Sequence, residues 1–74
     1  MDMHVRVIEV IPRFFKKSKQ VILKDDTIDL IVIPSKDDIV FIDDVRYKVI
    51  QRDIIMRKNL ELQRITLFVE KLLT

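Results

Sequence analysis

Hydrophobic and polar residues alternate at the start of this chain, over Met3–Ile11. A period of about two is typical of a half-buried β-strand, and Pro12 is expected to end this one because proline cannot donate to a central ladder. The next segment, RFFKKSKQ, is expected to be a polar connection, and VILKDD a short strand that runs into a turn. The run TIDLIVIP predicts a further strand, buried on both faces and stopped by Pro34.

The clearest local feature is Ile39–Ile50, in which the pair Asp43-Asp44 separates two apolar runs. A two-residue hairpin turn needs positive φ at both central residues, and Asp tolerates this best after Gly and Asn. The chain contains no glycine, so Asp-Asp is a reasonable turn here. Pairing Ile42 with Val45 predicts a core face made of Val40, Ile42, Val45, Tyr47 and Val49. The other face would carry Ile39, Phe41, Arg46 and Lys48.

The C-terminal segment, residues 60–73, allows two structures. As a helix it would be capped by Asn59 and present an apolar stripe. The run Ile65–Val69 is rich in β-branched and aromatic residues, which favours a strand paired with residues 46–56. In that pairing we expect Leu67 near Val49 and Phe68 near Lys48. The predicted core is then Val40, Ile42, Tyr47, Val49, Ile65, Leu67 and Val69.

The composition indicates one small β-rich domain spanning residues 1–74. Hydrophobic residues make up 49% of the chain, with Ile, Val and Leu dominant, and cysteine is absent, so no disulfide can support the fold. We therefore predict an all-β fold, a small barrel of five or six short antiparallel strands. Closing the sheet would bury one face and remove exposed edges.

The stretch IPSKDDIVFIDDVRYKV resembles a pattern found in small SH3-like barrels of bacteria and phages. That pattern has a proline, a turn with glycine-aspartate, a short apolar strand, aspartate-glycine, and a strand holding tyrosine and valine. Here Asp37 and Asp44 stand in place of its two glycines. The resemblance implies an SH3-like barrel. Such barrels serve as phage assembly proteins or nucleic-acid binders, among other roles.

No residue pattern indicates an enzyme or a cofactor. His4 is the only histidine, and neither Ser18 nor Ser35 has a histidine or a nucleophile motif beside it in the sequence. Carboxylates in KDDTID and SKDDIVFIDD could bind Ca²⁺ or Mg²⁺, but the alternating acidic loop with its glycine is missing. We expect these aspartates to serve turns and caps, and we expect no metal.

Two surfaces are therefore the candidates for function. The first is an outward patch on the predicted strands, composed of Ile39, Phe41, Arg46, Lys48 and Phe68. An error of one residue in register would turn these side chains inwards. The second surface combines basic and aromatic residues that could stack bases and contact phosphates: Arg13, Phe14, Phe15, Lys16, Lys17 and Lys19. Those aromatics could instead plug one end of the barrel.

The charge is unevenly distributed although the net charge is only +2. Residues 13–24 hold five basic and no acidic residues, whereas residues 25–44 hold seven aspartates and one lysine. Such a dipolar surface can orient an association. We expect a protein-interaction module that self-associates or docks into a larger assembly, for example one of the phage type. The alternative is a nucleic-acid-binding domain. The sequence shows neither a signal peptide nor a membrane span, so we expect a cytoplasmic or virion-associated protein.

Overall fold

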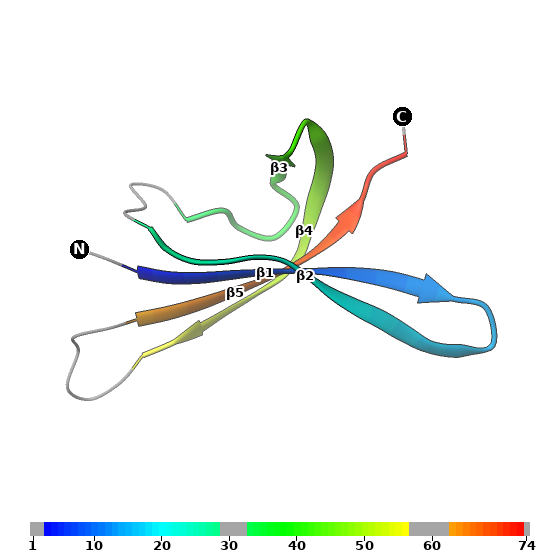
Figure 1. The fold of residues 1–74 in the computed structure, drawn as a ribbon, viewed down its shortest axis with the longest axis horizontal. Helices are drawn as coiled ribbons and strands as arrows, with labels where there is room; N and C mark the ends of the chain where they lie inside the picture. The colour runs from blue at the N-terminus through cyan, green and yellow to red at the C-terminus, as the bar shows by residue number, and fades with distance from the viewer. Residues whose placement is uncertain (1–2, 29–32, 57–62, 74) are drawn as a thin grey trace.

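A computed structural model of the chain describes residues 3–28, 33–56 and 63–73. It is all-β, as predicted, with five strands in one sheet (Figure 1). The strands are β1 (Met3–Arg13), β2 (Lys16–Ile28), β3 (Ile39–Ile42), β4 (Val45–Ile55) and β5 (Gln63–Lys71). Their order across the sheet is β2-β1-β5-β4-β3.

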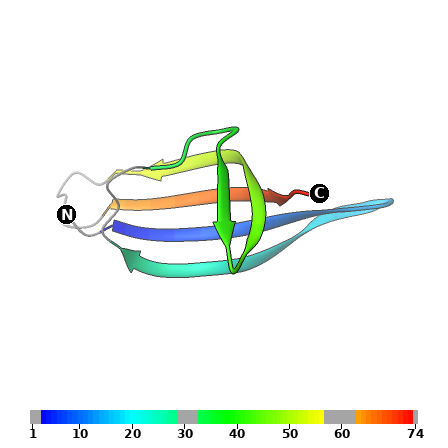
Figure 2. The same cartoon turned by 90° about the horizontal axis from the view of Figure 1, so that it is seen from above.

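The sheet is mixed and open, which corrects the prediction of an all-antiparallel barrel. β1 and β5 run parallel, whereas the other three neighbouring pairs are antiparallel. Within the described residues β2 and β3 are the two edges, and no hydrogen bonds join them to close the sheet. The β3–β4 hairpin instead curls over one face of β1, β2 and β5, as the view from above shows (Figure 2). That covered face holds the core.

The core consists of seven buried side chains on the inner face of β1, β5 and β4. They are Val5, Val7, Tyr47, Val49, Ile65, Leu67 and Val69. Five of the seven predicted core residues are among them, while Val40 and Ile42 are half-buried and pack against the cluster from β3. Val5 and Val7 were not predicted as core residues. They are buried because β5 lies beside β1, with Val5 opposite Ile65 and Val7 opposite Leu67.

The β3–β4 hairpin has the predicted register. Ile42 pairs with Val45, Val40 with Tyr47 and Phe41 with Arg46. Both turn residues adopt positive φ, 49° at Asp43 and 65° at Asp44, as a two-residue hairpin of this type requires.

The turn before β3 also uses aspartates. Asp37 has a φ of 76°, the conformation that glycine usually supplies. The Asp38 carboxylate accepts a 2.7 Å hydrogen bond from the Ser35 backbone N–H. The Asp38 N–H in turn donates to the Ser35 carbonyl at 3.0 Å. The predicted turn roles are confirmed for Asp37 and Asp38, but not for Asp25 and Asp26, which lie within β2.

The C-terminal segment is a strand and not a helix, but its predicted register is wrong. Val49 lies opposite Val69 and not Leu67, and Lys48 lies opposite Glu70 and not Phe68. β4 carries an extra residue, Ile50, between two paired positions. Such a β-bulge increases local twist and bending, which accounts for the curl of the hairpin over the sheet (Figure 1).

The largest difference from expectation lies between residues 13 and 28. In place of a polar connection and a short strand, β1 and β2 form one long hairpin that projects beyond the rest of the sheet (Figure 1). Pro12 does not end β1. It falls at a register irregularity between Ile11 and Arg13, where its missing N–H breaks no ladder bond. Of the run TIDLIVIP, predicted as a further strand, Thr27 and Ile28 belong to β2, residues 29–32 lie outside the described residues, and Ile33 and Pro34 form no strand. The predicted helix cap Asn59 also lies outside the described residues.

Candidate interaction surfaces

The tip of the β1–β2 hairpin gathers the whole basic and aromatic segment. Arg13 pairs with Lys16, so Phe14 and Phe15 form the two-residue turn. Both rings are almost fully exposed, at 87% and 95%, and they meet edge to face with centroids 4.5 Å apart. Four exposed cations surround them: Arg13, Lys16, Lys17 and Lys19. The six residues predicted as a nucleic-acid contact thus lie together. The two phenylalanine rings are exposed at the tip and do not pack into one end of a barrel.

Phe15 is held in an unfavourable backbone conformation. Its φ is 63°, in the left-handed region that a bulky side chain rarely occupies and that Gly, Asn or Asp usually fills in such a turn. The strain is of the order of 1–3 kcal/mol. Because the ring is 95% exposed, it gains little burial beyond its edge-to-face contact with Phe14 to offset the strain. A strained and exposed aromatic pair is poorly explained by folding alone.

The residues of the predicted outward patch separate into two places. Ile39 and Phe41 are 42% and 68% exposed and lie opposite Lys48 and Arg46 on the outer face of the β3–β4 hairpin. Phe68, however, is half-buried in the middle of the sheet. The bulge in β4 and the shifted pairing with β5 carry it away from Phe41.

Phe68 belongs instead to an apolar row across the outer face of the sheet. Ile8 on β1 pairs with both Ile22 on β2 and Phe68 on β5. Ile22 is 57% exposed, while Ile8 and Phe68 are half-buried. One partial signal for this row was present in the sequence: Ile8 lies on the same strand face as His4 and Arg6. It contained no signal that β1 and β5 are neighbours.

A hydrophobic groove opens between the β3–β4 hairpin and the rest of the sheet. Its volume is about 210 Å³, and buried Val5, Val7 and Leu67 form part of its lining. Further lining residues come from the segment before β3 and from β3 itself: Pro34, Val40, Phe41 and Ile42. Among the described residues, Lys24 on β2 is the one charged residue that lines it. The groove exists because the hairpin curls over the sheet without pairing with β2.

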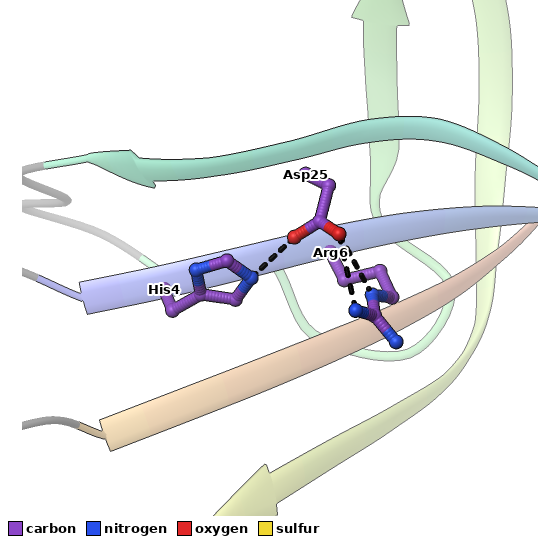
Figure 3. A network of polar contacts seen from close by, with 3 residues as sticks. All are labelled: His4, Arg6 and Asp25. Carbon is purple, nitrogen blue, oxygen red and sulfur yellow. Dashed lines mark hydrogen bonds and ion pairs between the residues drawn. The ribbon is translucent and has the colours of Figure 1, made fainter.

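A small polar network ties β1 to β2 on the outer face. The Arg6 side chain donates from Nε at 3.2 Å and from Nη2 at 3.0 Å to the same Asp25 carboxylate oxygen, Oδ2. His4 Nε2 contacts the other oxygen, Oδ1 (Figure 3). Arg6 and Asp25 are also directly paired across the two strands. The network contains no nucleophile and lies on an open sheet face, which fits a role in fixing strand register.

The environment of Asp25 favours its ionised form. Desolvation raises its pKa, but hydrogen bonds from Arg6 and His4, together with their charges, outweigh this effect. The pKa of Asp25 therefore lies below its ordinary value of 3.8. The stabilisation is fully present above the unfolded-state pKa and is lost as the pH falls through the lower folded-state pKa.

We expect the Asp25 network to be visible in acid unfolding. At neutral pH, Asp25→Asn should lower the melting temperature, because it removes the charge that Arg6 contacts. As the pH falls below about 4 the parent should lose this advantage, and the two melting temperatures should converge. Circular dichroism melts between pH 7 and pH 2 measure the difference, with Asp26→Asn as the control. A constant difference across that range would contradict the assignment.

Sites for chemistry are not evident in the described parts of the chain. Across residues 3–28, 33–56 and 63–73, no group of three or more His, Asp or Glu side chains could hold a metal ion. The same residues include no helix long and apolar enough to cross a membrane. The features that remain are the aromatic tip, the groove and the outer apolar row.

Comparison of the chain with protein-family models, with curated proteins and with solved structures gave no match. The assignment of function therefore rests on the geometry of these surfaces.

Proposed function

We propose that this chain is a non-enzymatic protein-interaction module that self-associates or docks into a larger assembly. One observation carries the proposal: the described residues bury seven side chains in the core but leave a larger set of big hydrophobic side chains exposed. That exposed set is Phe14, Phe15, Ile22, Ile39, Phe41, Ile54, Ile55, Met56 and Leu73.

Exposed apolar side chains are ordinary when scattered and informative when grouped. Here several are grouped. Phe14 and Phe15 share the hairpin tip, Ile39 and Phe41 share the outer face of β3, and Ile54 to Met56 are consecutive. A domain of 74 residues is also near the lower size limit for stability without further support. Association would bury these groups and add to a small core.

The proposal extends to an SH3-like relationship and a phage-type assembly. Its support is local. Asp37 and Asp44, which replace the two glycines of the SH3-like pattern, both adopt positive φ, at 76° and 65°. The pattern's backbone requirement is therefore met without glycine. In that setting the protein would be cytoplasmic, or virion-associated if it is a phage component.

Nucleic-acid binding is the second candidate, and the hairpin tip favours it. Two exposed rings that can stack on bases lie among four cations that can contact phosphates. Against it stand the net charge of +2 and the aspartates at both turns that flank β3. Those carboxylates would repel a phosphate backbone. The turn at the tip also contains only two residues, which leaves little surface along which a nucleic-acid strand could bind.

Light scattering separates the two candidates. At high concentration we expect a mass that is a multiple of the 8.9 kDa monomer and that persists in high salt, because apolar burial is not screened. A mixed oligonucleotide pool should leave that mass unchanged.

The matched control is a variant in which Lys16, Lys17 and Lys19 are changed to Gln. It should still associate through its apolar surfaces, and the lost charges should lower mainly the association rate. A parent that stays monomeric, yet binds oligonucleotides with a steep salt dependence that this variant lacks, would overturn the proposal.

A further inference from the structure

We propose that copies of this chain associate head to tail, with the Phe14-Phe15 tip of one copy seated in the hydrophobic groove beneath β3 of the next. The inference rests on the proposed self-association and names its two contacting surfaces. It unites two features that the fold leaves unexplained, a strained aromatic tip and an open apolar groove.

The tip has the properties of an anchor. The β1–β2 ladder extends to Arg13 and Lys16, so the two rings are held at the end of a hydrogen-bonded ribbon. Their geometry is set before binding, which reduces the entropy lost on association. Aromatic anchors that fill a pocket supply a large share of the affinity in many interfaces. The positive φ of Phe15 is tolerable if the ring gains burial in the complex.

The groove has the size and chemistry to receive a phenyl ring. Its volume of about 210 Å³ exceeds the roughly 150 Å³ at which an apolar protein cavity binds benzene. Valine, leucine, isoleucine and proline side chains dominate its lining. Lys24, the charged residue in that lining, can place its ammonium over the face of an aromatic ring, which is a favourable cation–π contact.

A copy cannot fill its own groove with its own tip. The groove is lined by Val5 and Val7, and Phe14 is seven residues beyond Val7 along the same strand. At about 3.3 Å per residue the tip lies on the order of 20 Å from the groove. The hairpin also extends away from β3 along the longest axis of the molecule, which measures 42 Å (Figure 1). The occupant must come from a second molecule.

Charge complementarity selects a second copy of this chain as that occupant. The tip carries Arg13, Lys16, Lys17 and Lys19, with no acidic residue between residues 13 and 24. The turns on either side of β3, which forms one wall of the groove, expose four aspartates: Asp37, Asp38, Asp43 and Asp44. Asp37 already contacts Lys48 Nζ at 3.5 Å, so the other three supply most of the attraction. A basic tip entering beside these carboxylates is attracted and oriented by them. The uneven charge along the sequence thus gives each copy a basic tip that complements the acidic turns beside the groove of the next copy.

The contact is heterologous because the two surfaces differ. Each copy offers one tip and one groove, so association leaves a free tip at one end and a free groove at the other. Such a contact generates a closed ring or an open filament, depending on the rotation between neighbours.

Complementation between two blocked variants tests the inference. The tip variant Phe14→Ser/Phe15→Asn keeps its groove, and Asn suits a positive φ, so this variant should fold at least as well as the parent. The groove variant Pro34→Arg/Phe41→Arg keeps its tip but fills the groove entrance with positive charge. Circular dichroism melts confirm that both variants are folded.

Each variant alone should be monomeric by light scattering where the parent associates, with the self-association constant reduced by at least about 30-fold, the effect expected for loss of a dominant anchor. An equimolar mixture should form a dimer and stop there, since the tip of the groove variant can enter the groove of the tip variant. A third variant, Phe15→Trp, contains a single tryptophan, because the parent chain has none. Its fluorescence emission should shift to the blue as the protein concentration rises.

The outcomes distinguish failure of the head-to-tail contact from failure of self-association itself. If the parent associates and the tip variant associates equally well, the head-to-tail contact is wrong while self-association stands. If the parent is monomeric at all concentrations, both are wrong. A Phe15→Trp emission that changes with oligonucleotide and not with protein concentration would assign the tip to nucleic-acid binding instead.

Discussion

Val49→Asp should leave the protein unfolded. Val49 is fully buried in β4, opposite Val69 of β5, and none of the buried side chains in the described residues is charged. A carboxylate there has no charged partner among them, and an uncompensated buried charge destabilises a protein by about 3–5 kcal/mol or more. A domain of 74 residues typically has roughly 4–11 kcal/mol of stability, with small domains near the lower end. The destabilisation by Val49→Asp is therefore comparable to the entire free energy of unfolding.

A matched exposed position separates burial from the change of residue type. Ile22→Asp also replaces a β-branched residue by aspartate within a strand, but its side chain is 57% exposed and can keep the new charge in water. It should retain a cooperative thermal transition by circular dichroism, whereas Val49→Asp should show none. A Val49→Asp variant that melts cooperatively would mean that Val49 does not face the core.

The β3–β4 hairpin could be predicted because everything that defines it is local. The turn residues Asp43 and Asp44 are adjacent, and the alternation on either side fixes which side chains share a face. A register error of one residue would have moved Val40 and Tyr47 to solvent, so the sequence constrains the pairing strongly.

The pairing of β1 with β5 could not be predicted in the same way. Met3 and Gln63 are partners across a parallel ladder, yet residues 4–62, most of the chain, separate them in sequence. No turn signal joins such strands, and alternation does not say which strand lies next to which. The register between β4 and β5 was equally hard to predict. Lys48 lies opposite Glu70, two residues from the predicted partner Phe68, and the bulge at Ile50 moves Phe68 one residue further, to Gln51.

Among the candidate surfaces, too, the one made of residues close in sequence could be predicted, and those that depend on strand order could not. The basic and aromatic tip was identified from sequence because its six residues are nearly consecutive, although its turn geometry was not. Phe14-Phe15 is an unusual choice for a two-residue turn, and turn chemistry predicts a connection there and not a hairpin. The groove and the outer row of Ile22, Ile8 and Phe68 depend on strand order, so they became visible only in three dimensions.

Ile65→Ala tests the long-range pairing that the sequence could not reveal. Ile65 is fully buried because β1 lies beside it, with Val5 as its partner on one side and Ile54 of β4 on the other. Its truncation should lower the free energy of unfolding by about 2–5 kcal/mol, through lost burial and the cavity left behind. The control is Ile54→Ala, the same substitution in the directly paired residue, which is 43% exposed.

Ile54→Ala should lower the free energy of unfolding by about 1 kcal/mol or less, since much of its side chain is already in water. Urea unfolding at equal protein concentration measures both values and keeps any contribution from self-association constant. If β5 were an edge strand without β1 beside it, Ile65 would be as accessible as Ile54, and the two substitutions would have similar effects. A difference of at least about 1 kcal/mol, with Ile65→Ala the more destabilising, is the result that the mixed sheet requires.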